Sequence, residues 1–297
     1  MTMALPTLAS VARHAASVLV DAGHDPAAAR QDVSVLARHV LRWDMARWLT
    51  HQDALAPDDF SAALLAAVER RRSHEPVAYI SGEREFYGRP FLVSRAVLIP
   101  RPETEDVVDA ALEVLQRPEL ASRPGPARVL DIGTGSGCLA VTIALEAPAT
   151  EVEATDISRA ALEIARENAA RLGVAGAVRF HESALTASSS GDFDVIVSNP
   201  PYVPVDDRMT LSRDVRDYEP TLALFGGRDG LDVIRALLPE AARALRPGGT
   251  LVMEIGQGQA DRVETLVRLA GLHWVGARPD LAGIPRVIAA RRPLPGT

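Results

Sequence analysis

The chain has 297 residues, of which 47% are hydrophobic and 24% are charged, a composition usual for a globular protein. Its single cysteine, Cys138, excludes an internal disulfide framework and a zinc site built from several cysteines. The net charge of −7 argues against a basic face for duplex nucleic acid. No apolar run is long enough to cross a membrane and the first residues lack a secretory pattern, so we expect a cytoplasmic protein.

Residues 1–74 are predicted to form a small helical domain. Three segments carry apolar residues at helical spacing, at 8–22, 33–41 and 60–68. Asp25 followed by Pro26 is typical of a helix N-terminus, and Gly23 indicates the end of the helix before it.

Residues 75–105 are predicted to be a connector of fixed shape. The segments 85–87 (EFY) and 90–93 (PFLV) flank a Gly-Arg pair, which indicates a β-hairpin. Further along, Pro100 and Pro102 flank Arg101, and two prolines at this spacing disfavour a helix and keep the chain extended.

Residues 106–297 alternate between predicted helices and strands, which indicates an α/β domain with a doubly wound, mostly parallel sheet. The expected helices are 107–115, 139–145, 159–172, 231–245 and 259–269. The expected strands are 128–132, 151–155, 177–180, 193–198 and 250–255, with two short strands near Trp274 and Val287. The segment 193–198 is apolar, as expected of a strand that is buried on both faces.

A glycine-rich loop follows the first of these strands and reads Gly133-Thr134-Gly135-Ser136-Gly137. The third glycine comes one residue too early for the dinucleotide fingerprint, and the acid just before the loop, Asp131, would repel a pyrophosphate. An acid suits a ligand with cationic amine and sulfonium groups, so we predict that the loop binds S-adenosylmethionine rather than NAD. A plain tight turn is the alternative.

A second acid, Asp156, ends the next predicted strand. Rossmann-like folds place an acid near this position, where it accepts hydrogen bonds from ribose hydroxyls. The same side chain can also cap the helix that is expected to begin near Arg159.

Asn199-Pro200-Pro201-Tyr202 follows directly on the apolar strand 193–198. Doubly wound sheets bind ligands at the carboxyl ends of their strands. The carbonyls of the Asn199 side chain and the Pro200 backbone can accept both hydrogens of a planar NH2 group, on which Tyr202 can stack. A rigid turn without a chemical role is the alternative. Combined with the glycine loop, this turn resembles that of methyltransferases that act on amino or amide nitrogen.

Other segments resemble the release factor glutamine methyltransferases of the PrmC/HemK type. They are 75–82 (EPVAYISG), 85–88 (EFYG), 99–105 (IPRPETE), 198–202 (SNPPY), 218–220 (YEP) and 223–224 (AL). The resemblance covers nearly the whole chain, and the PRPETE segment is its most specific part.

The resemblance implies a Rossmann-like class I S-adenosylmethionine-dependent methyltransferase domain, joined by the hairpin connector to a small N-terminal helical domain. It implies methylation of the glutamine in the Gly-Gly-Gln loop of class 1 peptide chain release factors. Residues 133–137 and Asp156 would then bind S-adenosylmethionine, and residues 199–202 would bind the glutamine amide. Ser183 and Ala184 occupy positions where the family often has an acid and an aromatic residue against the adenine.

The candidate site residues fall into three groups. The catalytic candidates are Asn199, Pro200 and Tyr202. The candidates for binding the cofactor are Asp131, Gly133, Thr134, Gly135, Ser136, Gly137, Asp156, Ser183, Ala184 and Asn199. The candidates for binding the substrate are Asn199, Pro200, Pro201, Tyr202, Arg101 and Glu103, although an internal ion pair that anchors the connector is an equal reading of Arg101 and Glu103. No metal is expected.

Other functions use similar features. A ribosomal-protein glutamine methyltransferase would share the Asn-Pro-Pro-Tyr turn, as would an adenine methyltransferase acting on DNA or RNA. The latter needs a base-flipping pocket and phosphate contacts, which the acidic charge and the lack of a basic domain disfavour. A non-catalytic nucleotide binder would not need the turn. We expect a monomer that binds neither nucleic acid nor membrane and clamps the release factor with its helical domain and hairpin.

Overall fold

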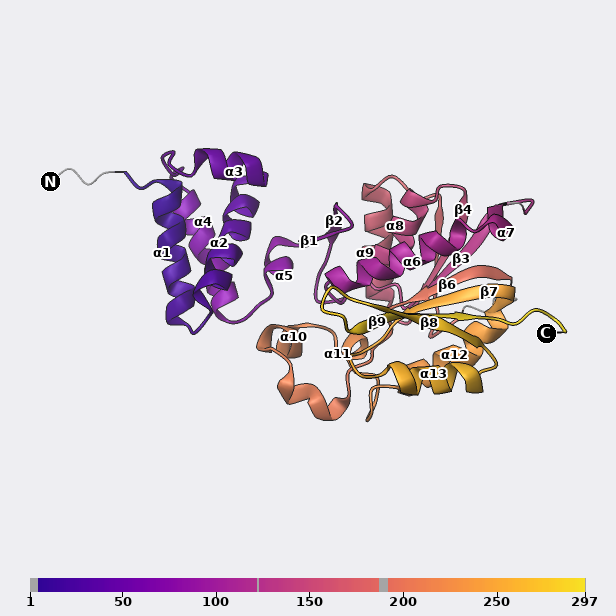
Figure 1. Ribbon diagram of the computed structural model, residues 1–297. Helices are drawn as coiled ribbons and strands as arrows, with labels where there is room; N and C mark the ends of the chain where they lie inside the picture. Colours follow the sequence, from indigo (N-terminus) through magenta and orange to yellow (C-terminus); the bar gives the residue numbers. More distant parts are fainter. Residues whose placement is uncertain (1–4, 122, 187–191, 297) are drawn as a thin grey trace. The chain divides into compact units, whose positions relative to one another are not determined.

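The computed structural model describes residues 5–121, 123–186 and 192–296 (Figure 1). Its contacts divide the described chain into two compact units. Unit 1 comprises Met1–Gly82 and Arg213–Tyr218, and unit 2 comprises Glu83–Ser212 and Glu219–Thr297. The helical unit thus extends beyond the predicted boundary at residue 74, because Ile80 is buried in its core.

Unit 1 is a bundle of helices around an apolar core. Its helices are α1 (Leu8–Asp21), α2 (Pro26–Leu41), α3 (Met45–His51), α4 (Phe60–Arg72), α5 (Val77–Ser81) and α10 (Arg213–Tyr218). As predicted, Asp25 caps α2, where its side chain accepts hydrogen bonds from the backbone N–H groups of Ala27 and Ala28. The short helix α10 belongs to this unit although it comes late in the sequence, and the Tyr218 hydroxyl donates to the Ser73 carbonyl at 2.7 Å.

The sheet of unit 2 has seven strands in the described residues, in the order β5-β4-β3-β6-β7-β9-β8. The strands are β3 (Ala127–Ile132), β4 (Thr150–Asp156), β5 (Val178–Glu182), β6 (Phe193–Ser198), β7 (Leu245–Glu254), β8 (His273–Pro279) and β9 (Pro285–Arg291). The first five in this order are parallel, whereas β9 runs antiparallel to β7 and β8 antiparallel to β9. The predicted mostly parallel sheet is confirmed.

Helices cover both faces of this sheet (Figure 1). On one face lie α6 (Glu105–Leu115), α8 (Cys138–Glu146) and α9 (Arg159–Arg171), and on the other lie α12 (Asp232–Ala244) and α13 (Ala260–Leu269). Side chains alternate between the two cores along each strand, so that Val195 and Val197 pack in one and Ile196 in the other. This explains why every residue of β6 is buried. The shorter helices are α7 (Pro118–Ala121) and α11 (Thr221–Leu224), with 3-10 helices η1 (Pro102–Thr104) and η2 (Val205–Thr210).

The predicted hairpin is formed by β1 (Glu83–Phe86) and β2 (Arg89–Leu92), which pair antiparallel. It packs as part of unit 2, with Phe86 and Phe91 in the same apolar core as residues of α6 and α8. The Asn168 side chain of α9 accepts from the Leu92 N–H at 2.7 Å and donates to the Leu92 carbonyl at 3.0 Å. The hairpin is therefore fixed to the α/β unit.

Two local expectations differ from the structure. The strand predicted at 250–255 begins earlier, at Leu245, which pairs with Phe193 before a register shift that accommodates Pro247, Gly248 and Gly249. The segment predicted to stay extended contains η1, because a proline at the first helical position gives up no hydrogen bond.

Candidate active site

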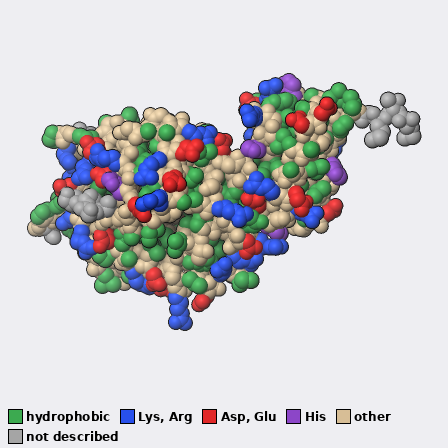
Figure 2. Space-filling view, turned by 180° about the vertical axis from the view of Figure 1, so that it is seen from behind, with side chains coloured by type: hydrophobic (Ala, Val, Ile, Leu, Met, Phe, Trp, Pro, Cys, Tyr) green, Lys and Arg blue, Asp and Glu red, His purple; other side chains and the backbone are tan. Residues whose placement is uncertain are grey.

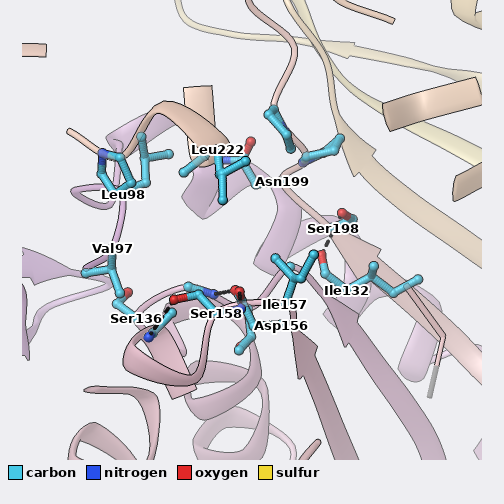
Figure 3. A pocket seen from close by; sticks show the side chains of 18 of the residues that line it. Val97, Leu98, Ile132, Ser136, Asp156, Ile157, Ser158, Ser198, Asn199 and Leu222 are labelled. Carbon is cyan, nitrogen blue, oxygen red and sulfur yellow. Dashed lines mark hydrogen bonds between the residues drawn. The ribbon is translucent and has the colours of Figure 1, made fainter. Parts of the chain in front are cut away.

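A cavity of about 330 Å³ lies at the carboxyl ends of β3, β4 and β6 in unit 2, within the size range of small-molecule sites. In Figure 3, Asn199 lies across the cavity from Ser136 and Asp156, and Val97 lies at a further side. Its apolar lining includes Val97, Leu98, Ile132, Leu139, Ile157, Ala184, Leu185, Leu222 and Leu237. The cavity thus brings together two of the predicted segments, the glycine loop and the turn after β6.

The glycine loop forms one wall of this cavity. Gly133 and Gly135 have φ values of 74° and 55°, a region in which residues other than glycine are strained. Added Cβ atoms at these two positions would meet no protein atom within 4 Å, so the loop backbone is open to a ligand. Thr134 and Ser136 also line the cavity, but Gly137 does not. A Cβ at Gly137 would lie 3.1 Å from the Ala165 Cβ, so this glycine lets α8 pack against α9.

Asp131 is buried behind the loop and does not line the cavity. Its Oδ2 accepts hydrogen bonds from the Thr134 hydroxyl at 2.6 Å and the Ala140 N–H at 3.2 Å, while Oδ1 has no partner in the described chain. Burial raises the pKa of Asp131 to about 7, although both hydrogen bonds oppose the shift. This carboxyl group holds the loop in shape from behind.

Asp156 lines the cavity at the end of β4. Its Oδ2 accepts from the Gly135 N–H at 2.9 Å, and its Oδ1 accepts from the Ser158 N–H at 2.8 Å. The cap of α9 is the Ser158 side chain, which accepts from Ala161. Asp156 therefore links the glycine loop to the start of α9.

The Asn-Pro-Pro-Tyr turn forms the opposite wall, and Asn199, Pro200 and Pro201 line the cavity. Asn199 Nδ2 donates to the Thr104 hydroxyl oxygen at 3.0 Å. Tyr202 does not line the cavity, because its ring packs toward α12 and α13 and its hydroxyl donates to Glu254 Oε1 at 3.0 Å. Its predicted stacking on the substrate stays a prediction.

Thr104 and Glu254 are site residues that sequence reasoning missed. Both are buried, and the Thr104 hydroxyl donates to Glu254 Oε2 at 2.6 Å. Burial raises the pKa of Glu254, against the hydrogen bonds from Thr104 and Tyr202. An acid in the last two residues of a strand was the available signal for Glu254, since such an acid also marks Asp131 and Asp156.

The remaining candidates lie around the cavity. Arg101 forms an ion pair with the buried Glu219, Glu103 is exposed, and neither lines the cavity. Ala184 lines it, whereas the Ser183 N–H donates to the Asp156 carbonyl at 2.9 Å. The predicted roles of Arg101, Glu103 and Ser183 toward ligands stay predictions.

Comparison with known proteins places this geometry in a family. Residues 10–82 match the PrmC N-terminal domain, and residues 104–212 match the methyltransferase small domain. A release factor glutamine methyltransferase of Bradyrhizobium diazoefficiens is 43% identical over 89% of this chain and 88% of its own length. The chain belongs to the release factor glutamine methyltransferase family. The relative from Cereibacter sphaeroides is 44% identical over 96% of this chain and 98% of its own length.

A solved structure shares the fold of part of this chain. A methyltransferase from Pyrococcus furiosus superposes with a TM-score of 0.52 at 20% identity, covering 70% of this chain and 91% of its own. This likeness is one of fold.

The described residues also show how charge is distributed on one face of the protein, and whether they include a membrane-spanning helix or a metal-binding group. On the face seen in Figure 2, arginines lie among aspartates and glutamates, and no continuous basic strip is visible there. Within the described ranges, no helix is long and apolar enough to span a membrane. The same residues contain no group of three or more His, Cys, Asp or Glu side chains with metal-binding geometry.

Proposed function

We propose that the protein transfers a methyl group from S-adenosylmethionine to the side-chain amide nitrogen of the glutamine in the Gly-Gly-Gln loop of class 1 peptide chain release factors. The observation that carries the proposal is that Asn199 and Pro200 line the same cavity as the glycine loop and Asp156. Relatives that are more than 40% identical over most of the chain are release factor glutamine methyltransferases, which supports the same reaction.

The cavity residues fit S-adenosylmethionine. Each carboxylate oxygen of Asp156 accepts one backbone N–H, and because such an oxygen has two lone pairs, each can also accept from a ribose hydroxyl. The bare backbone at Gly133 and Gly135 can approach a polar ligand, and Ile157 and Leu185 offer apolar surface to a purine. When bound, S-adenosylmethionine supplies a methyl group on a positively charged sulfur.

Asn199 and Pro200 are proposed to hold the glutamine amide. Asn199 Nδ2 donates to the Thr104 hydroxyl oxygen. Among the residues that the structure describes, no group donates to Asn199 Oδ1. Within the same residues, no group donates to the Pro200 carbonyl. These two oxygens can accept both N–H groups of the amide and so fix its nitrogen in the cavity. Positioning of this kind can lower a barrier by roughly 7–11 kcal/mol.

Unit 1 and the hairpin are proposed to recognise the release factor, because a glutamine on a loop offers the cavity few other contacts. We also propose that the protein acts as a monomer. A cytoplasmic location follows from the proposed substrate, which acts at the ribosome.

The test is a transfer assay with labelled S-adenosylmethionine and three acceptors: a class 1 release factor, total ribosomal protein and DNA. Label is expected on the release factor alone, and mass spectrometry should place it on the glutamine of the Gly-Gly-Gln loop. A release factor with alanine at that glutamine is the matched control. Label on ribosomal protein or DNA, with none on the release factor, would refute the proposed function.

A further inference from the structure

Three side chains from distant parts of unit 2 form a chain of hydrogen bonds beside the cavity. Asn199 Nδ2 donates to the Thr104 oxygen at 3.0 Å, and the Thr104 hydroxyl donates to Glu254 Oε2 at 2.6 Å. Thr104 ends η1, while Ser198 pairs with Met253, so that Asn199 and Glu254 are the next residues along neighbouring strands. The sheet register and η1 together build this chain.

The direction of these hydrogen bonds is determined at Glu254. Thr104 has a single hydroxyl hydrogen, and it donates this hydrogen to Glu254 Oε2. The Thr104 oxygen can then only accept from Asn199, which requires the NH2 group of Asn199 to face it. The carbonyl oxygen Oδ1 of Asn199 is left for the cavity, where a substrate N–H can donate to it.

A second observation shows that both oxygens of Glu254 are engaged. Oε1 accepts from the Tyr202 hydroxyl at 3.0 Å, and the Tyr202 carbonyl accepts from Gln259 Nε2 at 3.0 Å. Glu254 forms no ion pair with a described residue. Burial makes a carboxylate at this position costly, and a neutral side chain of similar shape would pack at lower cost. A glutamine at this position could donate from its NH2 group to the Thr104 oxygen, which a carboxylate cannot do.

We propose that Thr104 and Glu254 are positioning residues that hold Asn199 with its carbonyl oxygen toward the cavity, and thereby make the site select an acceptor that carries NH2 over one that carries a carboxylate. The identity of the acceptor rests on the proposed function, but the orientation of Asn199 does not. If the Asn199 amide were reversed, its NH2 group would face the cavity and favour glutamate in place of glutamine.

The central variant is Thr104→Val, which keeps the volume and removes the hydroxyl. Thr104→Ser restores the hydroxyl, and Thr104→Ala is available should valine disturb folding. Thr250→Val is the matched control, because Thr250 is equally buried on β7 and its hydroxyl has no hydrogen-bond partner in the described residues. Melting temperature and S-adenosylmethionine affinity are measured on each variant.

The first readout is selectivity. We expect Thr104→Val to lower kcat for the release factor about tenfold, the equivalent of about 1.4 kcal/mol, with a smaller change in KM. Release factor with glutamate in place of the loop glutamine is added as a competitor. The preference of the enzyme for glutamine over glutamate should also fall about tenfold in Thr104→Val. Thr104→Ser should recover most of the lost kcat and most of the lost preference for glutamine. Thr250→Val should behave as wild type.

The second readout needs no acceptor. The sequence contains two asparagines, Asn168 and Asn199, so asparagine-specific 15N labelling gives two side-chain NH2 signals. Asn168 is an internal reference, because its Nδ2 donates to the carbonyls of Leu92 and Ser136. We expect the Asn199 NH2 group to exchange with solvent about tenfold faster in Thr104→Val than in wild type, with Asn168 unchanged.

The two proposals fail in different ways. A wild-type enzyme that labels no release factor refutes the proposed function, and the exchange rates still decide whether Thr104 orients Asn199. An enzyme that labels release factor, but whose Thr104→Val variant keeps the wild-type kcat, selectivity and Asn199 exchange, overturns the positioning role and leaves the function standing.

Discussion

Arg101 and Glu219, which are 118 residues apart in sequence, form an ion pair in which Arg101 Nη2 lies 2.5 Å from Glu219 Oε1. The carboxylate side chain is only 1% exposed, whereas the guanidinium side chain is 31% exposed. Glu219 Oε2 also accepts from the Ile99 N–H at 3.3 Å. The pair therefore anchors the segment that leads into η1 and Thr104.

Removal of the guanidinium should destabilise unit 2. We expect Arg101→Met to lower the free energy of unfolding by about 2 kcal/mol, below the 3–5 kcal/mol of a fully buried pair because Arg101 is partly exposed. Arg171→Met is the control, since Arg171 and Glu83 form a pair that is 40% and 44% exposed and should contribute less than about 1 kcal/mol. Urea unfolding measures both, and equal losses would contradict an anchoring role.

The cofactor assignment predicts a loss of affinity in Asp156→Ala. The carboxylate is expected to accept from ribose hydroxyls, and it also holds the Gly135 N–H in place. Isothermal titration should show a dissociation constant for S-adenosylmethionine raised about tenfold or more. Glu182→Ala, at the exposed end of β5, does not touch the cavity and should keep the wild-type affinity. Unchanged binding in Asp156→Ala would remove Asp156 from the cofactor site.

Asn199→Ala tests the acceptor of the amide hydrogen. The side-chain oxygen is proposed to act mainly in the transition state, so its loss should lower kcat more than it changes binding. We expect kcat to fall roughly a hundredfold or more, with S-adenosylmethionine affinity and melting temperature nearly unchanged. A release factor methylation assay and a titration on the same sample measure these quantities. A near wild-type kcat would reduce Asn199 to a turn residue.

The raised pKa of Asp131 predicts a pH dependence of stability. Because burial raises this pKa from 3.8 to about 7, the folded protein binds more protons than the unfolded chain between these values. The contribution of Asp131 to the free energy of unfolding therefore falls as the pH rises through this range and is constant above it. Asp131→Asn has no such proton, and its oxygen can still accept from Thr134 and Ala140.

The measurement compares wild type with Asp131→Asn at pH 5 and pH 8. The variant should gain stability relative to wild type between these values, by on the order of 1 kcal/mol or more. Urea unfolding at each pH gives the difference directly. A difference that stays constant with pH would mean that Asp131 titrates alike in the folded and unfolded states.

The sheet and two walls of the cavity could be predicted because their signals are local. The glycine loop and the Asn-Pro-Pro-Tyr turn each follow an apolar strand, and parallel strands bring their carboxyl ends to one edge. The contacts among Thr104, Asn199 and Glu254 span up to 150 residues, and no local pattern determines which hydroxyl meets which carboxylate. Tyr202 lies in the predicted turn, directly after Pro201, yet Pro201 lines the cavity and Tyr202 does not.

The position of α10 in unit 1 has a consequence for synthesis. The chain enters the helical unit at its start, leaves it after Gly82, returns for Arg213–Tyr218 and leaves again. As the chain emerges from the ribosome, α1 to α5 come first, but the hydroxyl that bonds to the Ser73 carbonyl follows only after β6 has been made. The bundle therefore completes its fold late, and a fragment that ends at Gly82 lacks α10, which belongs to the bundle.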